Sequence, residues 1–447
     1  MDNEILKAEG DINLTEGRER WMDELPNETV EQLNADASCF IHQALSTPCL
    51  EILERCEGPY LITTSGKKIL DFHGNNLHQV GYGNRQVVDA VTSMLQQLPF
   101  SPRRYTNPVA IELAHQLGTK VPGLNRVLFA PGGSEANSMA LKLSRIVTGK
   151  FKVVSMWGSF HGGGLDTISV GGEASFRKNI GPLLPGVEHV PQPETYRRMW
   201  GNDPDQDLYV AFIRQVFENE GDVGALIAET IRNTDVQIPA PGFWQKVRTL
   251  CDEFGVTLIL DEIPIGLGRT GKFFAFEHYG ITPDIVTLGK GLGGGVFPMA
   301  AVLTSDKFNV GAEHSVGHFT HEKSPVGSAA GLAVLKVIEE DNLLTRTQQL
   351  GERMQKRLLE MKERYEIIGD VRGLGLLWAV DLVKDRKTKE RAISEAEQIM
   401  YRCLKNGLSF KVSQGNVINL SPPLIISEEE LDRALNILEE AFQNLKK

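Results

Sequence analysis

The sequence of 447 residues has no long apolar run and few cysteines. No segment reaches the ~18 consecutive apolar residues that a transmembrane helix needs, and the first 20 residues lack the apolar centre of a signal peptide. The five cysteines are an odd number without a CxxC pair, which favours reduced thiols over a disulfide framework or a zinc site. We therefore predict a cytoplasmic protein with no membrane partner and no bound metal.

Positive charge is also scarce. Lysine and arginine number 47 against 58 aspartate and glutamate residues, so the net charge of -11 excludes the basic field that nucleic-acid binding needs. Glycine, by contrast, is abundant, because 44 residues are roughly a tenth of the chain against about 7% on average. Glycine permits tight turns and close approach of the backbone to a ligand, so its positions point to candidate sites.

Short apolar runs rich in β-branched residues alternate with helical segments through the middle of the chain. This alternation predicts the α/β class, with a mainly parallel sheet, helices on both faces and ligands at the carboxyl ends of the strands. Helices are expected at 134–148 and 241–254, the second with a proline in its first turn. The predicted strands cover residues 127–130, 152–157, 225–230, 256–262, 284–288 and 299–304.

The C-terminal part of the sequence differs, because long charged helical segments flank one short apolar strand at 375–383. We predict an N-terminal segment (1–65) that joins a small domain, a large domain (66–326) that carries the site, and a C-terminal α+β small domain (327–447).

Five of the seven residues from Gly289 to Gly295 are glycine, and Lys290 lies among them after a predicted strand. A Walker-A loop is excluded, because Asp284 occupies the place of its first glycine and Gly291 follows the lysine. The spacing matches GxGxxG, but a strand follows instead of the required helix. A lysine at a strand end suits a Schiff base, since burial favours the neutral, nucleophilic amine. A solvated lysine is the alternative.

Two more motifs follow strands in the same way. Asp261 ends an apolar run, either as a turn or helix-capping acid or as the carboxylate that keeps the pyridine nitrogen of pyridoxal phosphate (PLP) protonated. Gly132, Gly133 and Ser134 lie between a strand and an amphipathic helix, where free N–H groups and the helix dipole would hold a phosphate. A purely structural tight turn is the alternative there.

Together these residues resemble the class III (ornithine/4-aminobutyrate type) aminotransferases, a family of PLP enzymes. The family hallmark stands here as LILDEIPIGLGRTG followed by TPDIVTLGKGLGGG, and the resemblance covers nearly the whole chain. It implies PLP fold type I, with a mainly parallel seven-stranded sheet between helices and a smaller α+β domain formed by the two termini. It also implies PLP as the cofactor.

The resemblance assigns roles to individual residues. Lys290 forms the Schiff base with PLP, and Asp261 pairs with the pyridine nitrogen. Gly133 and Ser134 bind the phosphate, and Phe160 stacks on the ring.

Two further residues match family positions. Thr320 matches the threonine that reaches the phosphate bound by a neighbouring subunit, which implies a homodimer with shared active sites. Glu229 occupies the strand-end glutamate position of the cofactor site, although Thr230 replaces the proline that usually follows. Without the resemblance, core packing and a surface turn explain Phe160 and Glu229 equally well.

Two positions depart from the family pattern. Members that act on amino acids commonly carry an arginine where this chain has Asn419, and some pair it with a glutamate where this chain has Thr234. Asparagine offers neither the charge nor the fork of a guanidinium, so an ordinary α-carboxylate clamp is not expected. We therefore predict that the amine-bearing carbon of the substrate lacks a carboxylate.

Other cations are available for an anionic substrate. Arg103 and Arg104 precede Tyr105, Arg232 follows the strand-end glutamate, and Lys323 is a further candidate. The arginine pair suits a phosphonate or phosphate dianion, and a solvated charge pair explains it equally well.

The segments DFHGNNLHQVGYGN, PRRYTN and SVGGEASFRKNIGPLLPG resemble one branch of the family, the (R)-1-hydroxy-2-aminoethylphosphonate ammonia-lyases of bacterial phosphonate degradation. This resemblance implies a lyase that eliminates the β-hydroxyl of a small amino-phosphonate and yields phosphonoacetaldehyde and ammonia. The alternatives are a class III ω-aminotransferase that passes an amine to a keto acid, a phosphoethanolamine-type phospho-lyase, and a non-catalytic protein of the same fold. Retention of Lys290 and Asp261 disfavours the last.

Overall fold

The computed structural model describes Trp21, residues 23–41 and residues 49–445, so most of the charged N-terminal stretch lies outside the described residues. The chain divides into two compact units. The larger unit comprises Asn75–Asn233 and Gln237–Thr347, and the smaller comprises Met1–Gly74, Thr234–Val236 and Gln348–Lys447. Each unit is described by itself.

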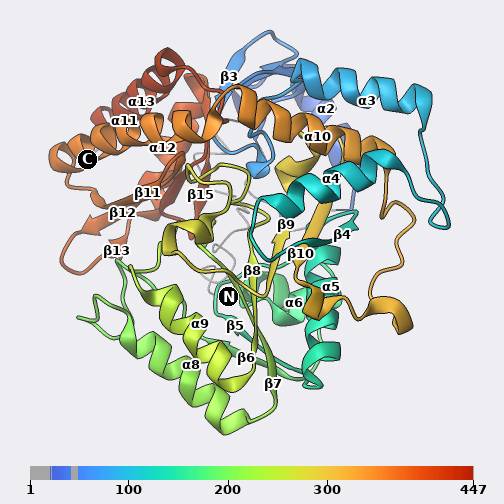
Figure 1. Ribbon diagram of the computed structural model, residues 1–447. Coiled ribbons are helices and arrows are strands. Elements are labelled where there is room, and N and C mark those ends of the chain that lie inside the picture. Colours follow the sequence, from blue (N-terminus) through green and yellow to red (C-terminus); the bar gives the residue numbers. More distant parts are fainter. Residues whose placement is uncertain (1–20, 22, 42–48, 446–447) are drawn as a thin grey trace. The chain divides into compact units, whose positions relative to one another are not determined.

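The larger unit contains the seven-stranded, mainly parallel sheet that we predicted (Figure 1), in the order β4-β10-β9-β8-β7-β5-β6. Only β10 is antiparallel to its neighbours. All six predicted strands are confirmed, and β6 is an additional edge strand that its short, half-buried sequence did not reveal. The strands are β4 (Arg126–Ala130), β5 (Lys152–Met156), β6 (Val187–Val190), β7 (Val223–Glu229), β8 (Thr257–Asp261), β9 (Ile285–Leu288) and β10 (Ala300–Thr304).

Helices enclose this sheet. Every residue of β7 and β8 is buried, as expected for parallel strands that helices cover. The predicted helix at 134–148 is confirmed as α5, but the helix at 241–254 begins only after Gly242, which has φ +90°. Its proline therefore precedes the first turn, contrary to our prediction. The helices are α3 (Arg85–Gln97), α4 (Pro108–Thr119), α5 (Gly133–Thr148), α6 (Leu165–Val170), α7 (Ala174–Arg177), α8 (Asp207–Glu220), α9 (Phe243–Phe254) and α10 (Pro325–Glu340).

The smaller unit has two sheets, β1-β2-β3-β14 and β11-β12-β16-β15, with β13 paired to β12. Its helix α13 begins with a capping box in which Ser427 and Glu430 satisfy each other's backbone N–H groups. The strands are β1 (Leu53–Glu57), β2 (Tyr60–Thr63), β3 (Lys68–Asp71), β11 (Ile368–Leu374), β12 (Leu377–Asp385), β13 (Glu390–Arg391), β14 (Leu408–Ser409), β15 (Lys411–Ser413) and β16 (Val417–Leu420). The helices are α2 (Asn27–Cys39), α11 (Leu343–Arg364), whose first residues belong to the larger unit, α12 (Ile393–Lys405) and α13 (Glu428–Gln443).

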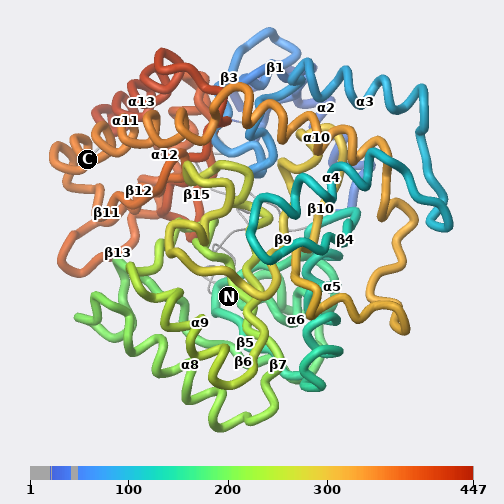
Figure 2. The backbone as a smooth tube through the Cα atoms, viewed as in Figure 1, coloured from blue at the N-terminus to red at the C-terminus, as the bar shows by residue number. Residues whose placement is uncertain are grey.

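Both domain boundaries differ from the predicted positions. Residues 66–74 belong to the smaller unit, because β3 pairs with β14 from the C-terminal part of the chain. Residues 327–347 belong to the larger unit, because α10 packs against α3 and α4 (Figure 2). No helix in the described part of the chain is long and apolar enough to cross a membrane.

A buried glutamate joins the ends of two strands of the larger unit. The Glu262 side chain, directly after β8, accepts hydrogen bonds from the Thr230 hydroxyl (2.6 Å) and from the backbone N–H groups of Ala275 (2.7 Å) and Phe276 (2.9 Å). The Thr230 hydroxyl thus makes a hydrogen bond that the proline usual at this position could not make, because proline has no side-chain donor. Burial raises the pKa of Glu262 from its ordinary value of 4.5 to about 7, although the three donors act in the opposite direction.

The raised pKa of Glu262 predicts a pH dependence of stability. The native state keeps this proton to a higher pH than the unfolded chain, so the free energy of unfolding falls between about pH 4.5 and pH 7, by at most about 3 kcal/mol. Glu262→Gln cannot ionise and lacks this fall. In urea denaturation, the free energy of unfolding of wild type should therefore fall relative to that of Glu262→Gln as the pH rises from 5 to 7. A difference that stays constant contradicts the assignment.

Candidate active site

Three predicted site residues, Glu229, Asp261 and Lys290, lie where parallel strands of the larger unit end. Glu229 on β7 stands opposite Asp261 on β8, and Asp261 stands opposite Thr287 on β9. Lys290 follows β9 after one intervening glycine, at the start of a short 3-10 helix (Lys290–Gly293). The carboxyl ends of β7, β8 and β9 therefore bring three separate motifs of the sequence to one edge of the sheet.

The Asp261 carboxylate is the most closely held group at this edge, with 2% of the residue exposed. Its Oδ2 accepts a hydrogen bond from Asn137 Nδ2 at 2.8 Å and lies 2.8 Å from His161 Nδ1. Its Oδ1 accepts from the backbone N–H of Ile263 (3.1 Å) and from the Thr287 hydroxyl (3.4 Å). Four partners from separate segments fix the direction in which this carboxylate points.

Sequence reasoning missed the three side chains among these partners, Asn137, His161 and Thr287. Asn137 lies on the buried face of α5 and also donates to the backbone carbonyl of His161 (2.8 Å), while the Thr287 hydroxyl donates to its Oδ1 (2.8 Å). His161 Nε2 is buried and has no hydrogen-bond partner among the described residues. The one local signal was position, since Asn137 lies in the first turns of the helix that follows the predicted turn and His161 follows Phe160 directly.

The turn predicted to bind a phosphate leads into the N-terminus of α5. Gly132 is the N-cap in extended conformation and provides no side-chain cap, so the first N–H groups of the helix remain available to an anion. The Ser134 hydroxyl accepts from the Gly164 N–H (3.0 Å) and lies 2.9 Å from the Thr167 hydroxyl. Gly162, at φ +136°, allows this approach, because a Cβ there would lie 2.6 Å from the Ser134 Cα.

Ile263 connects the phosphate turn to the lysine segment. A Cβ added at Gly133 would lie 2.7 Å from the Ile263 Cδ1, and one added at Gly289 would lie 3.3 Å from its Cγ2. The backbones on both sides of Ile263 therefore approach it more closely than other residues permit. This contact brings the phosphate turn, the segment after Asp261 and the glycine before Lys290 together.

Lys290 lies directly after Gly289, at the end of β9. Its backbone has φ +48°, a left-handed conformation that is rare for residues other than glycine and typical of functional sites. The surrounding structure must therefore hold Lys290 in this conformation.

Phe160 presents an open aromatic face at the end of β5. The residue is 37% exposed, and its ring contacts Phe176 of α7 with centroids 4.6 Å apart. Core packing therefore does not account for Phe160. A large aromatic ring left open beside a buried carboxylate can cover the face of a flat ligand.

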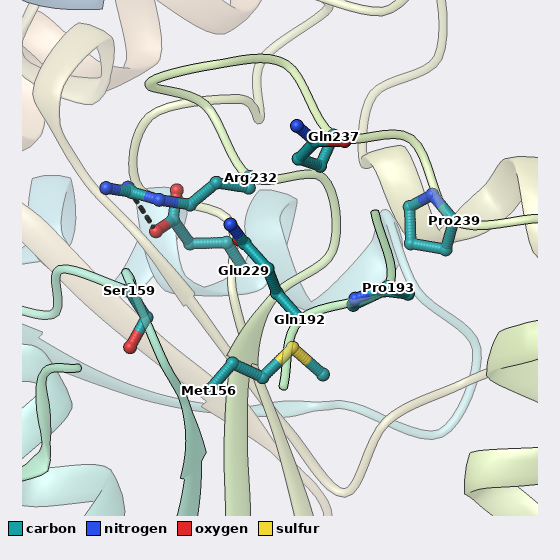
Figure 3. Close-up of a pocket in the computed structure, with 8 residues that line it drawn as sticks. All are labelled: Met156, Ser159, Gln192, Pro193, Glu229, Arg232, Gln237 and Pro239. Atoms are coloured by element: carbon teal, nitrogen blue, oxygen red, sulfur yellow. Dashed lines mark hydrogen bonds and ion pairs between the residues drawn. The ribbon is translucent and has the colours of Figure 1, made fainter. Parts of the chain in front are cut away.

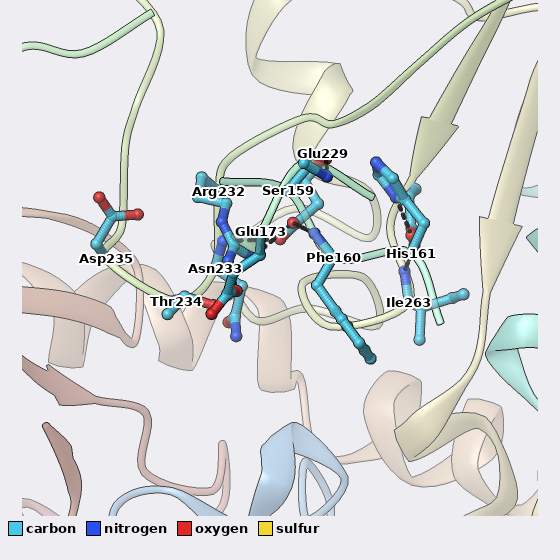
Figure 4. Close-up of polar contacts among 12 residues, drawn as sticks. Ser159, Phe160, His161, Glu173, Glu229, Arg232, Asn233, Thr234, Asp235 and Ile263 are labelled. Carbon is cyan, nitrogen blue, oxygen red and sulfur yellow. Dashed lines mark hydrogen bonds and ion pairs between the residues drawn. The ribbon is translucent and has the colours of Figure 1, made fainter. Parts of the chain in front are cut away.

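Glu229 and Arg232 form a buried ion pair (Figure 4). Arg232 Nη1 lies 2.7 Å from Glu229 Oε1, and Nη2 lies 3.1 Å from Glu173 Oε2. Glu229 also accepts hydrogen bonds from the backbone N–H groups of Phe160 (3.4 Å) and Asn233 (2.9 Å). Glu173, which we did not single out from the sequence, thus shares the guanidinium with the strand-end glutamate.

A small pocket lies beside this ion pair, at the carboxyl ends of β5 and β7 (Figure 3). The backbones of Arg232 and Gln237 exchange two hydrogen bonds (3.2 and 3.1 Å), which fix the loop on one side of it. The pocket is lined by Met156, Ser159, Gln192, Pro193, Glu229, Arg232, Gln237 and Pro239.

The other candidate cations of the larger unit lie on two connected loops. Arg103 Nε pairs with Glu322 Oε2 at 3.0 Å, the Phe100 and His321 rings contact each other, and Asn107 donates to the carbonyl of Lys323 (3.0 Å). Arg104, Tyr105, Thr320 and Lys323 are exposed on these loops. Among the described residues, Arg104 has no acidic partner, whereas Arg103 does.

The two departures from the family pattern meet in the smaller unit. Asn419, on β16, is 2% exposed, and its Nδ2 donates to the backbone carbonyl of Thr234 (3.2 Å). The Ser421 hydroxyl donates to Asn419 Oδ1 (2.9 Å). A neutral hydrogen bond thus stands where the resemblance places a charged pair.

The residues present fit PLP. The free N–H groups at the start of α5 suit its phosphate, the buried Asp261 carboxylate suits its pyridine nitrogen, the open Phe160 ring suits its face, and Lys290 can supply the amine. Gly133 and Gly289 both pack closely on Ile263, between the turn before α5 and the segment of Lys290.

Comparisons with known proteins agree with this geometry. Residues 42–442 match the model of the aminotransferase class-III family. The chain is 50% identical to the (R)-1-hydroxy-2-aminoethylphosphonate ammonia-lyase of Vibrio splendidus, over 99% of this chain and 96% of that protein. It is 38% identical to a leucine/methionine racemase of Thermococcus litoralis, over 85% of this chain and 88% of the other. A PLP-bound amine transaminase from an uncultivated Pseudomonas species has a similar structure, with TM-score 0.85, 29% identity and coverage of 91% and 99%.

Removal of the Lys290 amine tests the cofactor attachment. In protein purified with PLP, Lys290→Ala should lose the visible absorption band of the covalently bound cofactor, because the substitution removes the amine at the end of β9 that forms the Schiff base. The matched control is Lys307→Ala, at an exposed lysine in a separate 3-10 helix, which should keep the band. A Lys290→Ala protein with an unchanged band contradicts the assignment.

Proposed function

The chain belongs to the class III aminotransferase family, and from this premise we propose that it is a PLP-dependent ammonia-lyase that converts (R)-1-hydroxy-2-aminoethylphosphonate to phosphonoacetaldehyde and ammonia. The high identity to a lyase with that name over nearly the whole of both chains supports this substrate. The observation that carries the proposal is the neutral Asn419–Thr234 contact, which offers no charge to a substrate carboxylate.

The residues of the strand edge divide the chemistry between them. When bound, PLP withdraws electrons from the amine-bearing carbon of the substrate and makes its proton acidic. Lys290, as a neutral amine, takes that proton, and Asp261 holds the pyridine nitrogen in its protonated form. The N–H groups of Gly133 and Ser134 hold the phosphate, Phe160 covers the ring, and Glu229 fixes the Phe160 backbone.

The overall reaction balances without a second substrate. The β-hydroxyl leaves the carbon next to the amine-bearing carbon as the proton is lost, and one water then replaces the nitrogen, so aldehyde and ammonia are the only products. An aminotransferase differs, because it must bind a keto acid to accept the nitrogen. Such acceptors carry a carboxylate. Asn419 stands where an arginine would bind that carboxylate, so this chain is less suited to a keto acid.

The phosphonate dianion needs positive charge within an acidic protein. We assign this role to Arg104 with Tyr105, because Arg104 is exposed and has no acidic partner among the described residues, while Arg103 is neutralised by Glu322. Arg232 and Asn419 are weaker candidates, since each already has polar partners.

A homodimer with shared sites is part of the proposal. Thr320 is placed by resemblance at the phosphate bound by a second copy, and Phe100–His321, Arg103–Glu322 and Asn107–Lys323 contacts tie its loop to the loop of Arg104. Arg104 would then reach the same neighbouring site as Thr320. We also propose a cytoplasmic location, for which the five free cysteines are the supporting feature.

Release of ammonia without a keto acid tests the reaction. Wild-type protein loaded with PLP should release ammonia and phosphonoacetaldehyde in equal amounts from (R)-1-hydroxy-2-aminoethylphosphonate alone, because the elimination needs no amino acceptor. Lys290→Ala should release neither and serves as the control.

Other outcomes of that assay contradict the proposal in distinguishable ways. Turnover that begins only when pyruvate or 2-oxoglutarate is added identifies an ω-aminotransferase. Release of inorganic phosphate from phosphoethanolamine, without ammonia release from the phosphonate, identifies a phospho-lyase.

The role of Arg104 in binding the anion predicts an effect on substrate affinity. Arg104→Gln should raise KM for the amino-phosphonate by about tenfold or more, since one hydrogen bond to a charged group is worth about 1.5 to 3 kcal/mol. The rate at saturation should change little. Arg85→Gln, at an exposed arginine paired with Asp89 on α3, is the charge-matched control. Equal KM values for the two variants contradict the assignment of Arg104.

A further inference from the structure

Arg232 lies between two buried carboxylates (Figure 4). The exposed fractions are 9% for Arg232, 6% for Glu229 and 5% for Glu173, so water contributes little to stabilising these charges. Each carboxylate contacts a different nitrogen of the guanidinium, at 2.7 and 3.1 Å. The planar fork of arginine thus bridges two acids that come from separate parts of the chain.

Each of the two acids holds a segment next to the aromatic pair. Glu229 accepts the backbone N–H of Phe160, the residue that directly follows Ser159 at the end of β5. Glu173 precedes α7, accepts the Ser175 hydroxyl at 2.8 Å, and lies three residues before Phe176. The Phe160 and Phe176 rings contact each other, so the bridge made by Arg232 closes a ring of contacts that includes both aromatic residues.

We propose that Arg232 is a positioning residue that fixes the Phe160–Phe176 pair against the cofactor by bridging Glu229 and Glu173. This inference rests on the proposed function, because there Phe160 covers the PLP ring. Arg232 acts through the two glutamates and does not itself touch the substrate. Its contribution is to the orientation of the cofactor, and hence to the rate of proton removal at Lys290.

A direct role of Arg232 in binding the phosphonate is less compatible with the contacts. To reach a substrate, the guanidinium would have to release two carboxylates that are both buried, and each would be left with a charge that water cannot solvate. An exposed arginine pays no such cost. Arg232 is therefore suited to a fixed bridge between the two glutamates, and Arg104 is suited to binding the phosphonate of the substrate.

The bridge also explains why arginine is needed at this position. Lysine keeps the charge but presents one compact ammonium, which cannot direct two nitrogens at two acids in the same geometry. Glutamine can donate to one acid only and leaves the other unpaired. Arg232→Lys and Arg232→Gln thus separate the effect of charge from the effect of the bridge.

The experiment compares four variants with wild-type protein loaded with PLP. These variants are Arg232→Lys, Arg232→Gln, Glu173→Gln and the double variant Arg232→Gln/Glu173→Gln. The matched control is Arg248→Gln, which removes a partly buried arginine paired with Asp284 at 2.7 Å near the amino ends of β8 and β9, away from the site. The readouts are the dissociation constant of PLP, the circular dichroism of its visible band, kcat and KM.

The expected result is a split between rate and affinity. Arg232→Gln and Arg232→Lys should lower kcat by about 10- to 100-fold, as small misplacements of reacting groups do, with KM for the phosphonate within about twofold of wild type. The circular dichroism of the cofactor band should shift, and PLP should dissociate more readily. The double variant should be no worse than Arg232→Gln alone, because it leaves no unpaired charge at Glu173.

Two results would overturn the inference. If KM rises while kcat and the dichroic band stay at wild-type values, Arg232 is a substrate ligand. If the Arg232 variants match Arg248→Gln in every readout, the bridge contributes only to stability. If the wild-type protein never acquires the absorption band of bound PLP, the proposed function itself is wrong. This outcome differs from the two results above, in which wild-type protein binds PLP.

Discussion

The carboxylate of Asp261 is the group around which the candidate site is organised. A buried negative charge is costly unless donors surround it, and here an asparagine, a histidine, a threonine and a backbone N–H do so. These partners come from α5, from the segment after β5, from β9 and from the turn after β8. Holding one carboxylate therefore aligns four segments of the larger unit, and among them are those that carry the phosphate turn and the Phe160 ring.

Close backbone approach is the second constraint, and it explains why glycine is abundant. The clearest case is Gly162, where a side chain would collide with Ser134 and where φ is +136°. Gly133 and Gly289 approach Ile263 from two sides. The glycine excess that is visible in the composition is thus partly a property of the site, because these glycines allow segments around the site to pack closely on one another.

The sequence predicted the strands and motifs well, because buried parallel strands are continuous apolar runs and the reactive residues follow them directly. It did not establish the roles of Asn137, His161 or Glu173, because these roles depend on contacts between residues far apart in the chain. The start of α9 was wrong because the conformation of Gly242, rather than the proline before it, begins the helix. The boundaries between units were misplaced because long-range pairing of β3 with β14 leaves no local signal.

The buried charges of the site are paired, as Asp261 with its donors and Arg232 with Glu229 and Glu173 show. The most important role assigned here is that of Asp261, which keeps the pyridine nitrogen of PLP protonated. The most direct measurement of that role is ¹⁵N NMR of the protein loaded with PLP labelled at the pyridine nitrogen. We expect the chemical shift of a protonated pyridine nitrogen in wild-type protein at neutral pH. In Asp261→Asn we expect the shift of an unprotonated nitrogen. An unprotonated nitrogen in wild-type protein, or an unchanged shift in Asp261→Asn, would contradict it.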